Sequence, residues 1–222
     1  MTTPQTGASD TRVRGARLPR SARRVQLLGA AREVFVAQGY HAAAMDEIAE
    51  HAGVSKPVLY QHFPGKRELY IALIDQHTGE LLAAVRRALA STSDNKLRVA
   101  ATIQAFFEFI DADGEAFRLV FESDLTNDDD VRALVDRASG AVALAIADVI
   151  REDTGLPEQE SVLLGVALAG MANTTARYWV ATGKKIPRED ADRLVAMLSW
   201  RGIRGFPKAD GAPAGGSHPP VG

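Results

Sequence analysis

Residues 44–66 constrain the fold most, because they predict two short helices joined by a tight turn, with a third helix starting directly after them. Gly53 supplies the turn, Ser55 fits the N-cap of the next helix, and Pro57 fits its first turn, where no backbone donor is needed. The first helix is apolar on one face, at Met45, Ile48 and Ala49. This layout is a helix-turn-helix, which is typical of proteins that read DNA.

The second short helix, over residues 55–62, is expected to anchor through Val58, Leu59 and Phe63 and to leave a polar rim outside. The rim residues are Lys56, Tyr60, Gln61 and His62. In a major groove, amide side chains read base edges, whereas Lys, Tyr and His hold phosphates. The same rim is also compatible with an ordinary solvated helix face.

The charge of the chain is unevenly distributed, and this supports the DNA interpretation. Residues 1–70 hold 10 Lys/Arg and 6 Asp/Glu, a net charge of +4, whereas residues 71–222 hold 16 and 22, a net charge of −6. All charged residues from Thr11 to Arg32 are arginines. Because attraction to phosphate follows local charge, only the first third of the chain suits a polyanion.

The segment Ala31–Lys66 resembles the TetR family of transcriptional regulators. The matching motifs include Asp46-Glu47-Ile48-Ala49, Ala52-Gly53-Val54-Ser55 and Leu59-Tyr60-x-His62-Phe63. The resemblance implies that residues 56–58 and 60–62 face the groove and that Lys66 holds a phosphate. Position 44 departs from the family, because Ala44 stands where Ser or Thr is usual. The predicted DNA-binding residues are Arg20, Met45, Ser55, Lys56, Pro57, Val58, Tyr60, Gln61, His62 and Lys66.

Helical periodicity continues through the rest of the chain, and it predicts an all-α protein of nine helices. The expected helices span residues 20–38, 45–51, 55–62, 66–90, 95–111, 114–122, 128–152, 158–181 and 188–203. The expected domains are a mobile basic arm (1–19), a DNA-binding unit (20–65), a ligand-binding and dimerisation domain (66–204) and a disordered tail (205–222). The acidic run Asp128–Asp130 is interpreted as the N-terminal cap of the seventh helix.

Five of the eight phenylalanines lie between Phe106 and Phe121, and the helices expected to face them are rich in Ala and Gly. Large side chains opposite small ones can enclose an elongated apolar cavity, or the helices can close the gap and form an ordinary core. The predicted ligand-binding residues are Leu81, Leu89, Ile103, Phe106, Phe107, Phe117 and Phe121.

Small residues repeat about every four positions along the eighth helix, which allows another helix to approach closely. With apolar residues of the ninth helix, this ridge predicts a two-fold, four-helix interface between two copies of the chain. The predicted interface residues are Gly165, Ala169, Ala172, Ala176, Leu194, Met197 and Leu198, with Trp200 beside them.

A narrower resemblance extends into the ligand domain, at residues 104–110, 117–122 and 176–179. These stretches resemble the FasR type, the actinobacterial regulators of fatty acid synthesis. The resemblance implies control of lipid synthesis genes, with a long-chain acyl-CoA as the effector that releases DNA. Because the predicted dimer is two-fold symmetric, we expect it to bind a palindromic operator. The alternative is a TetR-type repressor of an efflux or catabolic operon that responds to a small hydrophobic molecule.

Other functional classes find little support in the sequence. The chain has no cysteine, its five histidines lack metal-ligand spacing, and no nucleophile elbow or phosphate-binding glycine loop occurs. We therefore expect neither an enzyme nor a bound cofactor. The longest uncharged run, residues 161–176, is too short to span a bilayer, and the N-terminus lacks the apolar core of a secretory signal. These features predict a cytoplasmic protein without a membrane partner.

Overall fold

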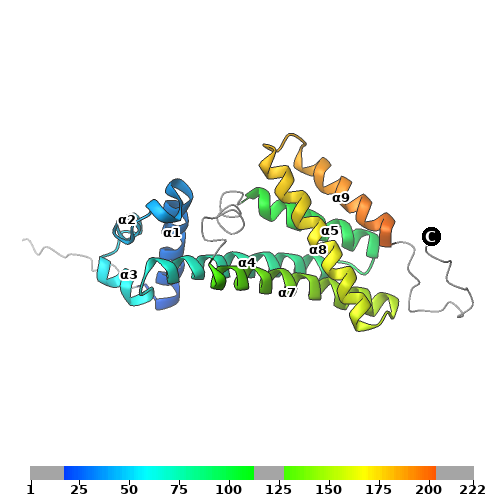
Figure 1. The fold of residues 1–222 in the computed structure, drawn as a ribbon, viewed down its shortest axis with the longest axis horizontal. Helices are drawn as coiled ribbons and strands as arrows, with labels where there is room; N and C mark the ends of the chain where they lie inside the picture. Colours follow the sequence, from blue (N-terminus) through cyan, green and yellow to red (C-terminus); the bar gives the residue numbers. More distant parts are fainter. Residues whose placement is uncertain (1–17, 113–127, 204–222) are drawn as a thin grey trace, which may run out of the picture.

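The computed structural model describes residues 18–112 and 128–203, and in these ranges every regular element is an α-helix. Figure 1 shows a head made of the first three helices and a long body in which α4 and α7 lie side by side. The helices are α1 (Arg20–Ala42), α2 (Met45–His51), α3 (Lys56–His62), α4 (Lys66–Ala90), α5 (Asn95–Ala112), α7 (Asp129–Thr154), α8 (Glu158–Ala181) and α9 (Arg188–Ile203).

The predicted all-α fold is confirmed, and the predicted helix bounds agree with the observed ones to within a few residues. The break predicted at Gly39 lies inside α1, where that residue has a non-helical φ of +79°. The turn between α2 and α3 is made by Gly53, whose φ of +63° is a conformation that only glycine adopts without strain. The helix predicted over residues 114–122, most of the arm and the tail lie outside the described residues. No helix of the described ranges combines the length and apolarity that a membrane crossing requires.

The head has its own apolar core, and two helices of the body contribute to it. Almost fully buried side chains come from α1 (Leu27 and Phe35), α2 (Ile48) and α3 (Leu59). Phe63, the residue directly after α3, is buried with them. The first two turns of α4 complete this core with Leu69, Tyr70, Leu73 and Ile74, and the first turns of α7 add Val131 and Leu134. Both α4 and α7 therefore join the head to the body.

The body has a second core, to which α4, α5, α7, α8 and α9 all contribute. The helices α7 and α8 cross closely at Gly165. A Cβ atom at this position would lie 2.3 Å from the Ala143 carbonyl oxygen and 3.1 Å from the Ala147 Cβ. The absence of a side chain at Gly165 thus sets how closely α8 approaches α7.

Lys66, the first residue of α4, holds the end of α1. Its Nζ donates to the carbonyl oxygens of Tyr40, His41 and Ala43 at 2.8, 3.1 and 2.9 Å, and it lies 4.6 Å from the centre of the Tyr40 ring. An ammonium group has three hydrogens to donate. All three are used on backbone carbonyl oxygens at the end of α1, where a helix leaves its last carbonyls without intrahelical partners.

The next residue, Arg67, connects α4 to α7. Its guanidinium donates to both Asp128 carboxylate oxygens at 3.0 and 2.9 Å and to Asp130 Oδ2 at 2.5 Å. The hydrogen bonds from Arg67 hold the pKa of Asp128 below its usual range, although partial burial opposes them, and the same bonds raise the pKa of Arg67. Asp128 also caps α7 by accepting from the Asp130 and Val131 N–H groups at 3.0 and 3.2 Å, as predicted.

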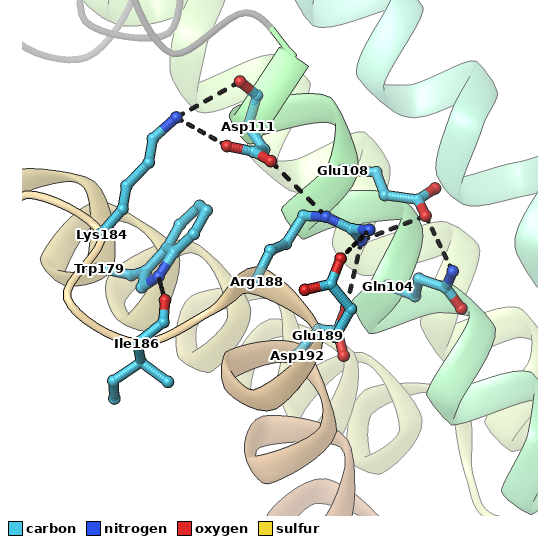
Figure 2. A network of polar contacts seen from close by, with 9 residues as sticks. All are labelled: Gln104, Glu108, Asp111, Trp179, Lys184, Ile186, Arg188, Glu189 and Asp192. Atoms are coloured by element: carbon cyan, nitrogen blue, oxygen red, sulfur yellow. Dashed lines mark hydrogen bonds and ion pairs between the residues drawn. The ribbon is translucent and has the colours of Figure 1, made fainter.

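A polar network between the end of α5 and the start of α9 fixes these two helices against each other (Figure 2). Arg188 reaches Glu108 Oε1 at 3.2 Å, Asp111 Oδ2 at 3.6 Å and Asp192 Oδ2 at 3.4 Å, and Lys184 adds a contact of 2.7 Å to Asp111. Burial raises the pKa of Asp192, and the charge of Arg188 opposes this increase. The network holds in place the helix that carries Ile103 and Phe106.

We predict that Gly165→Ala destabilises the protein by about 1–3 kcal/mol, because the new methyl group must push α8 away from the α7 backbone. The matched control is Gly79→Ala on α4, where a Cβ atom would meet nothing within 4 Å. The control should be neutral or raise the free energy of unfolding by up to about 1 kcal/mol. Urea unfolding of both variants checks this, and an equal effect of the two substitutions would contradict the close crossing.

We also predict that Lys66→Met lowers the free energy of unfolding by about 1–3 kcal/mol, because backbone oxygens at the end of α1 lose their charged donor. Lys96→Met is the control, since Lys96 is exposed on α5 and far from the head. Unfolding curves of the two variants give the comparison. If both lose the same amount of stability, Lys66 does not hold the end of α1.

Candidate DNA interface and ligand cavity

The helix-turn-helix is positioned by buried side chains on its inner face. Leu59 and Phe63 anchor α3 in the head core, and α2 is anchored by Ile48. Ser55 occupies the N-cap of α3 as predicted, but its side chain makes no capping bond; its carbonyl oxygen instead accepts from Val58 and Leu59 at 2.9 and 3.3 Å. Ala44 is the N-cap of α2 and likewise gives no side-chain bond.

The outer face of α3 carries most of the predicted rim. Lys56, Pro57, Tyr60 and Gln61 are exposed, and His62 and Val58 are half-buried. Lys56 Nζ pairs with Asp46 Oδ2 of α2 at 2.5 Å, and both side chains are exposed. A phosphate could replace that carboxylate without a large movement, because an exposed ion pair is worth little. Ser55 and Arg20 are exposed on the same unit.

One predicted DNA contact is corrected by the structure, and a second has a structural role. Met45 is 9% exposed and belongs to the head core, because it shares the inner face of α2 with Ile48 and Ala49. Lys66 donates its three ammonium hydrogens to backbone oxygens, as described above, so it fixes the end of α1; its contact with a phosphate stays a prediction.

Arginines of the first turns of α1 extend the rim of α3. The pKa of His62 is lowered, first by burial and then by the positive charges of Arg20, Arg24 and Arg23, so His62 is neutral near pH 7. Arg24 also stacks over Phe63, with its guanidinium carbon 4.5 Å from the ring centre. Only Arg20 was among the predicted contacts. The run of arginines before α1 was the signal that could have added Arg23 and Arg24.

The body contains an apolar cavity of about 220 Å³ between α4, α5, α7, α8 and α9. Leu89, Ile103 and Phe106 line it, as predicted, and Val142 and Ile146 of α7 form the opposite wall. Phe107 does not line it, because its ring is buried in the core 5.7 Å from the ring of Trp179. This corrects the prediction for Phe107. Phe117 and Phe121 lie outside the described residues.

A second cavity of about 180 Å³ adjoins the first and is nearer to the head. It contains Leu81, the remaining predicted wall residue, together with the polar side chain of Asn173. The two cavities share Phe106, Val142 and Ala169, so these three side chains form the partition between them.

One end of the first cavity is polar, and this was not predicted from the sequence. Arg98 of α5 and Asp153 of α7 both line this end, and Arg98 Nη1 lies 2.8 Å from Asp153 Oδ2. The two residues are 55 positions apart in the chain. No local pattern could have paired them.

The structure separates the predicted interface residues into a buried group and an exposed group, and the interface itself stays a prediction. Gly165, Ala172 and Ala176 are buried inside the chain, and Ala169 lines both cavities, because the small-residue ridge of α8 faces α7 and the core. Trp200 also lines the first cavity. The large apolar side chains on the outer faces of α8 and α9 are more than one-third exposed: Leu163, Val166, Tyr178, Leu194, Met197 and Leu198.

Comparisons with known proteins agree with this architecture. Residues 27–73 match the family of bacterial regulatory proteins described as the tetR family. The HTH-type transcriptional activator FasR of Mycolicibacterium smegmatis is 45% identical over 194 residues, which cover 87% of this chain and 89% of that protein.

Solved structures show the same fold. A TetR-like transcriptional regulator from Rhodococcus sp. RHA1 is 27% identical, with a TM-score of 0.65 over 85% of this chain and 100% of that chain. The transcriptional regulator FadR from Bacillus subtilis, solved in complex with stearoyl-CoA, has a TM-score of 0.64 at 20% identity and covers 79% of this chain and 96% of its own. This chain therefore belongs to the TetR family of bacterial regulatory proteins and is a DNA-binding transcriptional regulator similar to FasR rather than an enzyme.

Proposed function

We propose that this protein regulates genes of fatty acid or lipid synthesis in the cytoplasm. It binds a palindromic operator as a symmetric dimer, and a long-chain acyl-CoA releases it from DNA. One observation carries this proposal: the apolar cavity is walled by α4 and α7, and these two helices also complete the core of the DNA-binding head. The 45% identity to FasR supports lipid synthesis as the regulated process.

The exposed rim of α3 fits a major groove. Gln61 is the side chain suited to a base edge, and Lys56, Tyr60 and the arginines of α1 are suited to phosphates. In a two-fold dimer the two α3 helices read half-sites that lie one helical turn apart, about 34–36 Å. Binding therefore depends on the distance between the two heads.

The cavity fits an apolar chain. Each buried CH₂ group contributes about 0.8 kcal/mol, so a dozen methylenes supply roughly 10 kcal/mol before the costs of binding. The two cavities adjoin each other across Phe106, and a shift of this ring on binding would join them into an elongated space for such a chain, with CoA at the surface. FadR of B. subtilis has the same fold and was solved in complex with stearoyl-CoA, which is consistent with this use.

Release follows from the shared helices. A chain in the cavity pushes on the walls formed by Val85 and Leu89 of α4 and by Val142 and Ile146 of α7. Because the other ends of these helices are packed in the head core, a displacement changes the orientation of the head. An effector releases DNA if it binds more tightly to the conformation whose two heads do not match the half-sites than to the conformation whose heads match them.

The second candidate is a repressor of an efflux or catabolic operon that responds to a small hydrophobic molecule. The separation of the two cavities by Phe106 favours this candidate, since the first cavity alone suits a compact ligand. The two candidates differ in the length of the ligand that displaces DNA.

The dimer surface gives a direct test. We predict that Leu198→Glu separates the dimer, because the two-fold axis brings two like charges together in a buried apolar surface, at a cost of several kcal/mol. Leu97→Glu on α5 is the control, since Leu97 is similarly exposed and lies on another helix. Sedimentation measures the assembly. An intact dimer in the Leu198→Glu variant would place the interface elsewhere.

The effector gives the main test. Leu89 lines the cavity, so Leu89→Phe should exclude the acyl chain. The concentration of palmitoyl-CoA that releases half of the DNA should rise at least about tenfold. The variant should therefore stay on DNA at a concentration that releases about 90% of the wild type. Leu97→Phe adds the same bulk outside the cavity and should behave as the wild type does. Acyl-CoAs of increasing length are titrated against a labelled operator below their micelle-forming concentrations. Release by a small planar drug and by no acyl-CoA of twelve or more carbons would favour the second candidate.

A further inference from the structure

The polar end of the first cavity is built around Arg98. Its side chain is only 16% exposed, and it donates from Nε to the Thr92 carbonyl oxygen at 3.0 Å and from Nη1 to Asn95 Oδ1 at 2.9 Å and Asp153 Oδ2 at 2.8 Å. These bonds fix the guanidinium plane between the start of α5 and the end of α7. An arginine held in this way is pre-organised to recognise another acceptor.

Arg98 also marks an opening of the cavity. It lines both the cavity and a wide outer groove between α4 and α7, and the two spaces share Leu89, Arg98 and Val149. Within the described ranges, the hydrogen bonds of Arg98 involve Nε and Nη1, and the hydrogens of Nη2 are not used in any of them. An acyl chain that fills the cavity and leaves through the groove therefore passes Arg98, whose Nη2 hydrogens can donate to a further acceptor.

The charge beside this opening decides which head group can pass. Asp153 already neutralises Arg98, and its side chain is 31% exposed. The groove adds Arg86 together with Asp148 and Glu152, and Arg151 pairs with Asp148 at 3.0 Å, so these four groups carry no net positive charge that would favour an anion. A free carboxylate next to Arg98 would lie beside the Asp153 carboxylate, and like charges at close quarters are strongly unfavourable. A neutral carbonyl oxygen accepts from Nη2 without this repulsion.

We propose that the Arg98–Asp153 pair is a head-group filter, which accepts the neutral thioester carbonyl of an activated acyl chain and rejects the carboxylate of the free fatty acid. This inference rests on the proposed function, because it requires an acyl chain in the cavity. Arg98 donates to the thioester oxygen, and Asp153 supplies the negative charge that excludes the free acid. The uncharged pantetheine arm of CoA then lies in the groove, with the phosphates beyond it.

The filter predicts a specific response to one isosteric substitution. Asp153→Asn keeps an acceptor for Arg98 and removes the negative charge. The free acid should then bind more tightly, whereas the thioester should change little. Asp136→Asn is the matched control, because Asp136 is exposed on the same helix and lines neither the cavities nor the groove.

The experiment is calorimetric titration of the full-length protein with hexadecanoate and with the N-acetylcysteamine thioester of hexadecanoic acid, which has a neutral head and no phosphates. We expect the wild type and Asp136→Asn to bind the thioester at least about tenfold more tightly than the acid. In Asp153→Asn the difference should fall below about threefold through tighter binding of the acid. Thermal melts verify that the variants are folded.

Three results would overturn the inference. The filter is contradicted if the wild type binds both ligands equally tightly. It is also contradicted if Asp153→Asn keeps the wild-type difference in affinity between thioester and acid. In both cases the proposed function stands if these ligands still release operator DNA. Binding of neither ligand contradicts both the filter and the acyl effector of the proposed function. DNA release is therefore measured in parallel with binding.

Discussion

The side-by-side packing of α4 and α7 is the constraint on which the rest of the molecule depends. Leu69 to Ile74 of α4 and Val131 with Leu134 of α7 lie in the head core, and the distal halves of both helices form walls of the cavity. Arg67 joins the two helices through Asp128, where they enter the head. Because protein interiors are close-packed, a separation of α4 and α7 at the cavity is transmitted to the head rather than absorbed.

The shape of the cavity follows from the distribution of large and small side chains around these two helices. Gly165 lets α8 approach the α7 backbone, while Phe106 and Ile103 of α5 keep the other side of α7 apart from its neighbours. The polar network around Arg188 holds α5 against α9, so α5 does not collapse into the space. The outer faces of α8 and α9 leave large apolar side chains exposed, as the proposed dimer requires.

The sequence was sufficient to predict the helices and the reading head, because these depend on signals within one or two turns. Helical spacing placed Ile48 and Leu59 inside, and the turn at Gly53 separated α2 from α3. Features made by residues distant in the chain were missed. Lys66 bonds to carbonyls 23 to 26 residues earlier, and Arg98 pairs with a residue 55 positions later.

The misplaced residues share a physical cause. The helix α8 has an inner ridge of small residues and an outer row of large apolar ones, and periodicity cannot tell which row faces the chain's own core. The same ambiguity assigned Ala172 to the dimer surface and Phe107 to the cavity. Met45 was placed among the DNA contacts although the apolar spacing of α2 already indicated that this residue lies inside.

The central claim is that a ligand in the cavity changes the distance between the two heads of the dimer. The chain has no cysteine, so Gln61→Cys on the exposed face of α3 provides a single attachment site for a spin label in each subunit. Pulsed electron–electron double resonance measures the distance between the two labels. This distance should be near the operator spacing of about 34–36 Å without ligand and should shift clearly with palmitoyl-CoA. An unchanged distance in protein that calorimetry shows to be saturated, and that no longer binds operator DNA, would contradict the account.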